Sequence, residues 1–275
     1  MRVALGQHES VRGDVAANLA RMDKTVTESG ADLVVFPELF LTGYNARDGH
    51  MRLAEALDGP SVAAVKGMAK ASGATVVFGM PERDPMRRGV IYNSAVLVRP
   101  DGTADAYRKY SLPNFGPFEE KVFFAPGKRA VVAEGRHARI GLMICYDMFF
   151  PELAKLETLL GAQLLANVSA APTTSRPFFR RVMPGRAVEN AVFLAYTNLV
   201  GVHGSLVFGG GSVLLGPRGE ELGKGRDLEE DIVTAEVDLA DLDVARRFRP
   251  TVRDTRPELL QEIVSVLTTG KVKGG

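Results

Sequence analysis

The chain has 275 residues, of which 45% are hydrophobic and 24% are charged. This composition is that of a globular protein, and it excludes a disordered or collagen-like chain. The 34 Lys and Arg residues nearly balance the 33 Asp and Glu residues, which gives a net charge of +1. That balance excludes an overall field that would attract the protein to nucleic acid or to an anionic membrane, so we expect neither as a partner.

Cys145 is the single cysteine of the sequence, so no intrachain disulfide can form and we predict a reducing, cytoplasmic environment. The four histidines lie far apart, at positions 8, 50, 137 and 203, and no CxxC or HExxH pattern occurs. We therefore expect no dedicated metal site. The N-terminal apolar run is too short for a secretory signal peptide, and no apolar stretch approaches the roughly 20 residues that span a bilayer.

Short apolar runs alternate with amphipathic segments in the first part of the chain. We predict three strands and two helices there: strands at residues 3–5, 33–36 and 75–78, and helices at 18–29 and 61–72. Gly30 ends the first helix, and Ser61 has the side chain of an N-cap for the second. This β-α-β-α-β order predicts a mostly parallel sheet covered by helices.

The same alternation returns after a hairpin and a long loop. A Pro-Asp-Gly turn at 100–102 predicts a hairpin between strands 92–98 and 104–110, and a loop follows at 111–128. The later predictions are strands at 131–132, 140–144, 164–165, 193–200, 213–215 and 231–237, helices at 151–160 and 180–190, and a turn at 217–220. We predict one α/β domain over residues 1–265 and a flexible tail over 266–275.

Cys145 closes the apolar run 140–144, and Pro151 begins the helix beyond it. A thiol that is held at the end of a buried strand, close to a helix N-terminus, is expected to have a lowered pKa. Cys145 is therefore a candidate nucleophile. The alternative is a small buried hydrophobic residue, which is the commoner fate of a free cysteine.

Three charged residues lie at places where chemistry is common in α/β proteins. Glu38 follows a buried strand, and its apolar neighbours would desolvate the carboxylate, which suits a general base. Lys109 ends the strand 104–110, and Glu120 lies in an aromatic-rich loop. Taken singly, each is more simply a capping or solvated residue. The sequence lacks the GxSxG, P-loop and dinucleotide-binding patterns, so we expect no cofactor.

Three motifs combine these residues in a fixed order: 36–44 (FPELFLTGY), 107–110 (YRKY) and 144–152 (ICYDMFFPE). Together they resemble the nitrilase superfamily of carbon–nitrogen hydrolases. Supporting segments are 118–120 leading to 125–127, 186–190 and 196–198. The resemblance runs from residue 2 to about residue 253, and three ordered motifs are far more specific than any one of them.

The resemblance implies a four-layer αββα sandwich that pairs into homodimers or larger homo-oligomers. The catalytic Glu, Lys and Cys of the superfamily correspond to Glu38, Lys109 and Cys145. A second glutamate, which orients the lysine and the substrate, corresponds to Glu120, with the adjacent Glu119 as an alternative. A thiol nucleophile with a carboxylate base needs neither a metal nor a cofactor.

The implied reaction is hydrolysis of a non-peptide C–N bond in a small amide through a cysteine thioester. Lys109 and the backbone N–H of Tyr146 would stabilise the tetrahedral oxyanion. Tyr44, Phe149 and Asn167 would line the pocket, together with the segment 167–172. Because this lining is mostly apolar, it suits a small aliphatic or aromatic amide.

The residues after the cysteine bear on the substrate. Tyr146-Asp147 is similar to the amidase branches, whereas nitrilases often carry Trp-Glu and N-carbamoyl hydrolases Trp-Asp. Phe149 stands where omega-amidase-like members often carry an arginine, so a substrate carboxylate would need Arg176 or Arg180. We therefore predict an amidase. The alternatives are a nitrilase or N-carbamoyl-amine hydrolase with the same triad, or a non-catalytic metabolite-binding member. We do not expect a glutamine-fed synthetase domain, because no ATP-binding extension is present.

Overall fold

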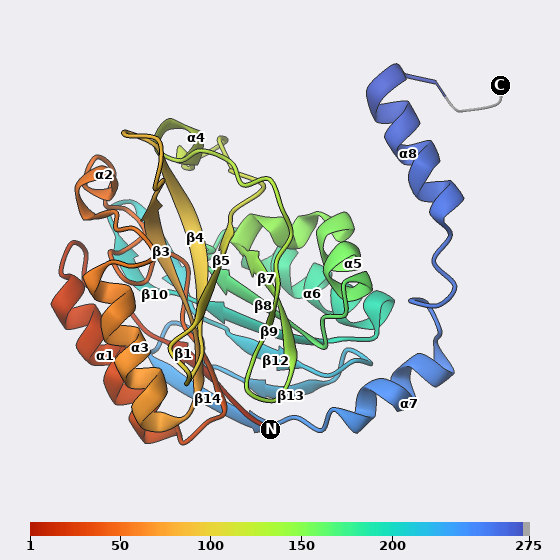
Figure 1. Cartoon of the computed structure of the whole chain (residues 1–275), viewed down its shortest axis with the longest axis horizontal. Coiled ribbons are helices and arrows are strands. Elements are labelled where there is room, and N and C mark those ends of the chain that lie inside the picture. The colour runs from red at the N-terminus through yellow and green to blue at the C-terminus, as the bar shows by residue number, and fades with distance from the viewer. Residues whose placement is uncertain (272–275) are drawn as a thin grey trace.

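Six strands form the first sheet, in the spatial order β14-β1-β2-β3-β4-β5 (Figure 1). The computed structural model describes residues 1–271 and gives these bounds: β1 (Arg2–Gln7), β2 (Leu33–Val35), β3 (Thr75–Arg83), β4 (Ile91–Val98), β5 (Ala104–Arg108) and β14 (Asp231–Glu236). β1, β2 and β3 run parallel, and the other strands pair antiparallel with their neighbours. β2 is buried on both faces, which explains its uninterrupted apolar run.

The second sheet has the order β13-β12-β9-β8-β7-β6 and repeats the plan of the first. Its strands are β6 (Val132–Glu134), β7 (Arg139–Ile144), β8 (Leu164–Ser169), β9 (Phe193–Asn198), β12 (Val213–Leu215) and β13 (Glu221–Lys224). β7, β8 and β9 run parallel, with a hairpin on one side and a single antiparallel strand on the other. A separate hairpin consists of β10 (Val200–His203) and β11 (Leu206–Gly209).

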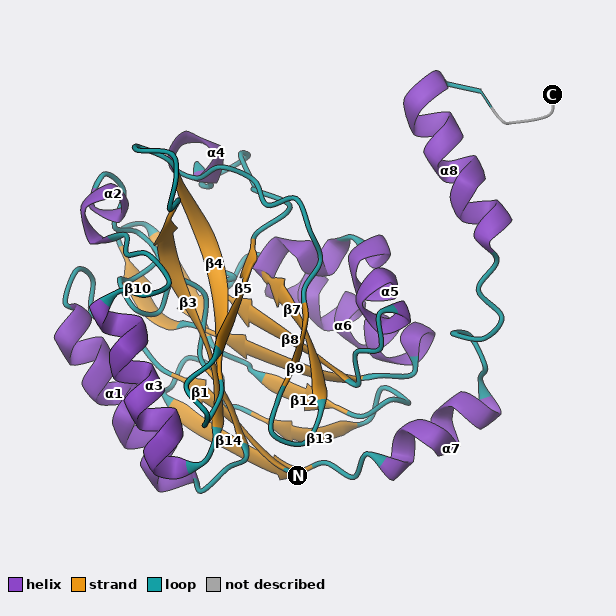
Figure 2. Ribbon diagram, viewed as in Figure 1, coloured by secondary structure: helices purple, strands orange, loops and turns teal. Residues whose placement is uncertain are grey.

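Helices cover the outer faces of both sheets (Figure 2). α1 (Val15–Ser29) and α3 (Pro60–Ser72) lie on the first sheet, and α5 (Pro151–Leu159) and α6 (Arg176–Asn190) lie on the second. The layers therefore follow the order helix, sheet, sheet, helix. This arrangement confirms the predicted αββα sandwich.

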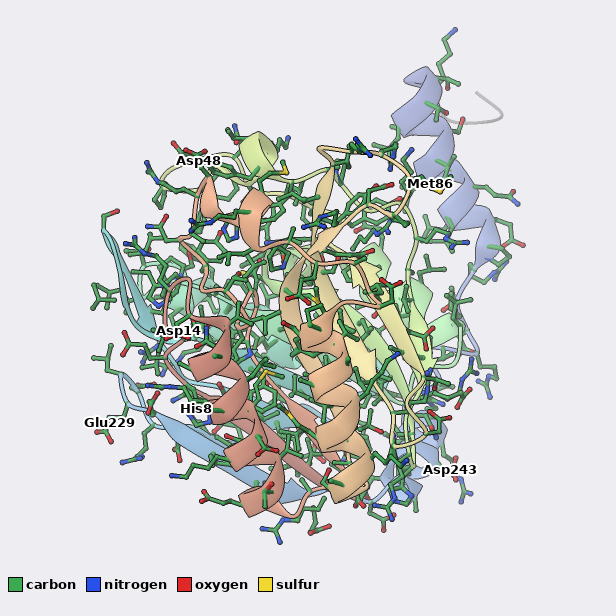
Figure 3. The ribbon with its side chains drawn as sticks, turned by 60° about the vertical axis from the view of Figure 1, so that its left-hand side comes forward. His8, Asp14, Asp48, Met86, Glu229 and Asp243 are labelled. Carbon is green, nitrogen blue, oxygen red and sulfur yellow. The ribbon has the colours of Figure 1, made fainter. Side chains whose placement is uncertain are left out.

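α1 illustrates how local sequence sets these helices. Asp14 lies directly before it, and its carboxylate accepts a hydrogen bond from the Ala17 N–H, which caps the first turn (Figure 3). Gly30 ends the helix in the left-handed region at φ 56°. Met22 and Val26 are buried on the face toward the sheet. The helix predicted at 18–29 is thus confirmed, with three further residues at its start.

An apolar seam holds the two sheets together. Both sheets contribute buried residues to one core cluster, including Val3, Leu5, Leu33 and Val35 from the first sheet and Ile140, Leu142, Leu164 and Val168 from the second. Burying a side chain of this size stabilises the fold by about 1.5–3 kcal/mol. The seam therefore fixes the distance between the sheets and brings the strand ends of one sheet opposite those of the other.

The prediction of a mostly parallel sheet is wrong in part, because each sheet is parallel only across three strands. The β4–β5 and β12–β13 connections are short turns, and a short turn can join only antiparallel neighbours. Both of these hairpins agree with the predicted turns.

The N-cap prediction for Ser61 is also wrong. α3 begins at Pro60, whose missing N–H suits the first helical position, and Gly59 precedes it. Ser61 instead donates from its backbone N and its Oγ to the Glu55 carboxylate, at 2.9 and 2.7 Å. A side chain from the preceding loop therefore caps this helix, and no local pattern signals such a partner.

Five helices were not predicted from the sequence. They are α2 (Gly49–Leu53), α4 (Glu120–Phe123) within the predicted loop 111–128, the 3-10 helix η1 (Cys145–Phe149), α7 (Ala240–Phe248) and α8 (Pro257–Thr269). α2, α4 and η1 have only four or five residues each, too few for a periodic pattern. α7 and α8, with 9 and 13 residues, are long enough to carry such a pattern, and their prediction was missed.

α8 stands apart from the sandwich (Figure 1), and none of its residues is buried. It continues to Thr269, four residues into the segment predicted as a flexible tail, and residues 272–275 lie outside the described part of the chain. Among residues 1–271, no helix has the length and apolar character needed to cross a membrane.

Candidate active site

Four chemically capable side chains come from different segments that end at one place between the sheets. Glu38 follows β2, Lys109 follows β5, Cys145 follows β7, and Glu120 begins α4. β5 runs in the same direction as β2, since two antiparallel steps separate it from β3. The three strands therefore present their carboxyl ends at the seam, where α/β folds place ligands.

A close approach of two backbones shapes the turn that carries Glu38. Leu39 adopts a left-handed conformation at φ 48°, and the turn lies against Gly79 of β3. A Cβ atom at Gly79 would stand 2.2 Å from the Leu39 nitrogen and 2.7 Å from Glu38 Cα. Only glycine fits there, so the sequence at β3 is part of what places Glu38.

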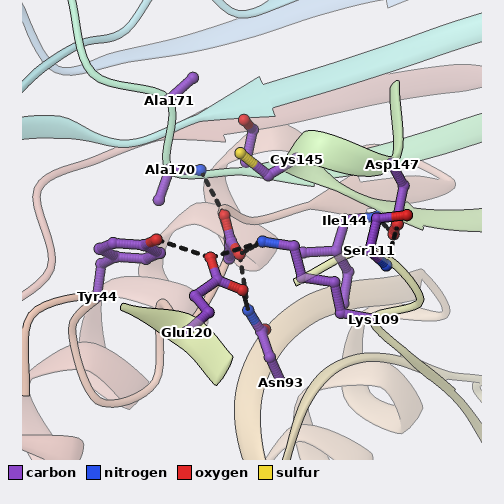
Figure 4. Close-up of polar contacts among 12 residues, drawn as sticks. Tyr44, Asn93, Lys109, Ser111, Glu120, Ile144, Cys145, Asp147, Ala170 and Ala171 are labelled. Carbon is purple, nitrogen blue, oxygen red and sulfur yellow. Dashed lines mark hydrogen bonds and ion pairs between the residues drawn. The ribbon is translucent and has the colours of Figure 1, made fainter. Parts of the chain in front are cut away.

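Lys109 and the two glutamates form one buried cluster (Figure 4). Lys109 Nζ donates to Glu38 Oε1 at 2.6 Å and to Glu120 Oε1 at 2.7 Å. Asn93 Nδ2 donates to Glu38 Oε1 at 2.7 Å, and the Tyr44 hydroxyl donates to Glu120 Oε1 at 2.7 Å. Glu38 and Lys109 are fully buried and Glu120 is 4% exposed, so this cluster is held without bulk water.

The charges of this cluster are strongly coupled. Burial disfavours the ammonium form of Lys109, but the Glu120 and Glu38 carboxylates outweigh burial and raise its pKa above the usual value. Burial also raises the pKa of Glu120, to about 7, against the opposing effect of Lys109. Lys109 is therefore a permanent cation, and Glu120 titrates near neutral pH.

Cys145 occupies a strained turn next to the cluster. It is the first residue of η1 and has φ 44°, a value that is uncommon for a residue with a side chain and that occurs often at active sites. In Figure 4 the Cys145 side chain lies beside the polar contacts of Lys109, close enough for the charges of Lys109 and the glutamates to act on its thiol. The thiol is 6% exposed, and Ser169 at the end of β8 is its hydrogen-bond partner.

The pKa prediction for Cys145 is wrong in direction. Burial raises the pKa of the thiol, and the Glu38 carboxylate raises it further, whereas Lys109 and the Ser169 hydrogen bond oppose that shift. The segment after Cys145 is the five-residue η1, so α5 begins only at Pro151 and its dipole is too distant to compensate. The resting nucleophile is therefore a thiol rather than a thiolate.

The structure distinguishes the two neighbouring glutamates. Glu120 contacts Lys109, whereas the Glu119 side chain is 55% exposed and pairs with Arg47 at 3.6 Å. Glu120 is thus the glutamate that contacts Lys109, and its role as the second catalytic glutamate stays a prediction. Tyr44, predicted as a pocket residue, belongs to the same cluster through its hydroxyl.

The other predicted substrate residues lie at mixed positions. Asn167 is fully buried behind the nucleophile, and its Nδ2 donates to the Cys145 carbonyl at 3.4 Å. Phe149 packs on Phe179 and on Tyr146, with ring centroids 4.9 and 5.7 Å apart. The backbone N–H of Tyr146 lies in the first turn of η1, where such groups have no intrahelical partner.

Arg176 and Arg180 do not lie free beside the nucleophile. Both guanidinium groups pair with Asp227. Arg176 also approaches the Gly209 carbonyl, at 3.5 Å. Neither is therefore a ready partner for a substrate carboxylate.

Sequence reasoning missed Asn93, and it gave no individual role to Ser169 and Ala170 within the predicted pocket segment 167–172. Asn93 supports Glu38 from β4, and the Ala170 N–H donates to Glu38 Oε2 at 2.9 Å. Ser169 approaches the thiol and also donates to the Tyr196 hydroxyl at 3.3 Å. The available signal was the presence of polar side chains, Asn93 and Ser169, within otherwise apolar strands. Within residues 1–271, no group of three or more His, Cys, Asp or Glu side chains is arranged to hold a metal ion.

Comparison with known proteins gives a consistent result across the chain. The family model for carbon-nitrogen hydrolases matches residues 2–247. The chain is 36% identical to a nitrilase from Pyrococcus abyssi, covering 81% of this chain and 84% of that relative. It is 35% identical to an (R)-stereoselective amidase from a Pseudomonas species, covering 93% and 92%.

One relative is much longer. A glutamine-dependent NAD(+) synthetase from Thermotoga maritima is 33% identical over 265 residues, which is 91% of this chain and 45% of the synthetase. The chain therefore spans less than half the length of that relative.

Among solved structures, a variant of the amidase from Nesterenkonia sp. AN1 superimposes with a TM-score of 0.80 at 32% identity, covering 95% of this chain and 98% of that one. In that variant a glutamate is replaced by glutamine, and acrylamide has added to the active-site cysteine.

Proposed function

The chain belongs to the carbon–nitrogen hydrolase family, and from this premise we propose that it hydrolyses a small amide to a carboxylic acid and ammonia through a thioester on Cys145. The observation that carries the proposal is the buried contact of Lys109 with Glu38 and Glu120 beside the Cys145 thiol. A base, a cation and a nucleophile at one water-poor place are what acyl transfer requires.

Acylation begins with a protonated thiol. Glu38 accepts the Sγ proton as the thiolate attacks the amide carbon. The π electrons of the C=O bond move to its oxygen, which becomes the oxyanion. Within residues 1–271, two of the three Lys109 N–H donors are used by the glutamates, so one is free for this oxyanion. The Tyr146 N–H supplies a second donor, and removal of one such donor typically costs 100- to 1000-fold in kcat.

Collapse of the tetrahedral species breaks the C–N bond and forms the thioester. Glu38 gives the proton it accepted to the departing nitrogen, which leaves as ammonia. Water then attacks the thioester carbon and loses a proton to Glu38. The C–S bond breaks, the acid departs, and the proton on Glu38 returns to Sγ, so each turnover consumes one amide and one water.

Glu120 supports this cycle without exchanging protons with the substrate. Its carboxylate binds Lys109 and accepts from Tyr44, which holds the ammonium toward the reacting carbon. Correct placement of a charged donor accounts for a large part of catalysis in a site of this kind.

An amide is favoured over the other C–N substrates by the Tyr146-Asp147 pair after the nucleophile and by the amidases among the relatives. A nitrile is the second candidate, since a nitrilase is 36% identical to this chain. An N-carbamoyl amine would use the same three residues and release carbon dioxide as well. A homodimeric assembly and a cytoplasmic location stay predictions.

The test is ammonia release from a matched panel of small amides, nitriles and N-carbamoyl amines, with wild type beside Cys145→Ala. We expect release from amides by wild type alone, together with an acyl mass on the wild-type protein after acid quenching. Ammonia release from nitriles would instead identify a nitrilase. Release of carbon dioxide from the carbamoyl compounds would identify an N-carbamoyl-amine hydrolase. A folded wild type that releases ammonia from no compound would contradict the proposal and support a metabolite-binding protein.

A further inference from the structure

One buried carboxylate joins the two segments that carry Lys109 and Cys145. Asp147 Oδ2 accepts from the Tyr107 hydroxyl at 2.8 Å and from the Ile144 N–H at 3.1 Å. Its Oδ1 accepts from the Ser111 N–H at 2.9 Å. The polar contacts from Ser111 and Ile144 converge on Asp147 in Figure 4.

The positions of these donors along the chain are what make the contact informative. Tyr107 precedes Lys109 by two residues, and Ser111 follows it by two. Ile144 is the residue directly before Cys145. Asp147 therefore holds the lysine segment on both sides of Lys109 and holds the chain at the residue directly before Cys145, using one rigid planar group.

Burial of this carboxylate costs free energy of folding. Asp147 is fully buried, and within residues 1–271 no cationic side chain forms an ion pair with it. Burial raises its pKa to about 6, while the charge of Lys109 and the three hydrogen bonds oppose that shift. An apolar residue would cost less in a purely structural position. The Tyr107 oxygen in turn accepts from the Tyr110 N–H at 3.1 Å, so this network includes a third residue of the segment around Lys109.

We propose that Asp147 is a positioning residue for the reaction, which sets the separation between the Lys109 ammonium and the Cys145 sulfur. The oxyanion must meet the Lys109 Nζ and the Tyr146 N–H together, and these groups sit on the two segments that Asp147 joins. A displacement of about 1 Å between them is enough to cost on the order of 100-fold in rate. This inference rests on the proposed hydrolysis, and its test includes one measurement that needs no substrate.

Asp147→Asn is the informative variant because it keeps the shape and removes an acceptor. If the amide oxygen faces Tyr107 and Ile144, its NH2 group opposes the Ser111 N–H. If the amide is reversed, the NH2 group opposes the Ile144 N–H. Either orientation places two donors against each other, so one segment must move.

The chain offers a closely matched control in Asp84, which is 8% exposed and lies in the loop after β3. Its carboxylate also accepts from a tyrosine hydroxyl and two backbone N–H groups: Tyr92 at 2.7 Å, Met86 at 2.9 Å and Arg87 at 2.8 Å. Asp84→Asn therefore removes an acceptor with the same kinds of donors, together with an ion pair to Arg87 at 2.7 Å that Asp147 lacks. Within residues 1–271, Asp84 makes no hydrogen bond with Glu38, Lys109, Glu120 or Cys145. Tyr107→Phe and Tyr92→Phe form a second, milder pair.

The experiment measures three quantities for each variant: kcat and KM on the best amide, the rate of Cys145 alkylation by iodoacetamide at pH 7 followed by intact mass, and the melting temperature. We expect Asp147→Asn to lower kcat at least about 100-fold with KM changed less than about 3-fold. We expect alkylation to slow at least about 5-fold, because the Lys109 charge that stabilises the thiolate moves away. Asp84→Asn should leave kcat and alkylation within about 2-fold of wild type.

Tyr107→Phe keeps the Asp147 charge and decides the question if Asp147→Asn does not fold. We expect it to lower kcat about 5- to 10-fold and to slow alkylation, whereas Tyr92→Phe changes neither. The inference is overturned if a folded Asp147→Asn keeps the wild-type kcat and the wild-type alkylation rate. If Asp147→Asn does not fold, the same result for Tyr107→Phe overturns it. In either case Asp147 is a structural residue. If wild type hydrolyses nothing, the proposed function fails, but the alkylation comparison still supports or overturns the role of Asp147.

Discussion

The Lys109 ammonium nitrogen lies 2.6 Å from Glu38 Oε1, and both side chains are fully buried. A buried pair of this kind is no guide to stability, since its desolvation can offset its attraction. The pair matters for function because each member shifts the pKa of the nearby thiol. Glu38 raises the pKa of Cys145, and Lys109 lowers it, so the nucleophile is held between two opposing charges.

Removing the Glu38 charge should separate turnover from thiol reactivity. In Glu38→Gln no base remains to accept the thiol proton, so we expect amide hydrolysis to fall at least about 1000-fold. The pKa of Cys145 should fall at the same time, because a carboxylate that raised it is gone while Lys109 remains. Addition of acrylamide or iodoacetamide to Cys145 at pH 7 should therefore be as fast as in wild type or faster. Mass spectrometry with Cys145→Ala as the blank measures it, and loss of both reactivities together would contradict this account.

The pH dependence of alkylation tests the state of the resting thiol. Because burial and Glu38 raise the pKa of Cys145, the thiolate fraction of wild type should still be increasing at pH 9. We expect the alkylation rate to rise about tenfold per pH unit from pH 7 to pH 9 without levelling. An unperturbed cysteine, with a pKa of about 8.5, would begin to level within this range. Denatured wild type supplies that reference curve, and coincident curves for the folded and denatured protein would refute the prediction.

The two adjacent glutamates should respond very differently to the same substitution. Glu120→Gln removes a charge that binds Lys109, so we expect kcat/KM to fall at least about 100-fold. Glu119→Gln removes only an exposed contact with Arg47 at 3.6 Å and should change kcat/KM less than about 2-fold.

The pH profile gives a second readout for this pair. The pKa of Glu120 is about 7, so we expect the kcat/KM of wild type to fall as the pH drops below neutral and Glu120 becomes protonated. Glu119→Gln should keep that acid limb. Equal losses in the two variants would show that the second glutamate has been misassigned.

The strand ends could be predicted from the sequence because neighbouring residues mark each of them. Pro37 stops an apolar run before Glu38, and Cys145 follows five apolar or small residues, so both candidates were found with the hairpin that carries Lys109. Their combination needed the family resemblance, because each residue alone has a commoner structural explanation.

The remaining parts of the site depend on contacts between distant segments. Asn93 reaches Glu38 across 55 positions, and the Ala170 N–H reaches it across 132. The pairing of β14 with β1 joins the two ends of the domain in the same way. The sign of the Cys145 pKa shift also depends on this packing, since the local dipole argument ignored the burial that decides it. A single sequence does not show these long-range contacts or the burial that they produce.

Glu157 on α5 should make stability depend on pH in a way that its amide removes. Its side chain is fully buried, and only the backbone N–H groups of Val131 and Leu142 oppose the effect of that burial on its pKa. Burial raises its pKa well above the ordinary 4.5, and the Asp147 carboxylate adds to that shift. A group whose pKa is raised on folding contributes stability that is fully present below its unfolded value and is lost as the pH rises through its folded value.

Glu157→Gln cannot ionise, so it should be more stable than wild type only where wild type has lost this contribution. We expect its melting temperature to exceed that of wild type by about 2–6 °C at pH 8, which corresponds to roughly 1–2 kcal/mol for a domain of this size. Near pH 4.5 the two should melt within about 1 °C of each other. Glu152→Gln, an exposed change on the same helix, supplies the control and should shift the melting temperature little at either pH. A difference between Glu157→Gln and wild type that is the same at both pH values would mean that the effect comes from packing, and that Glu157 is not a buried acid whose ionisation opposes folding.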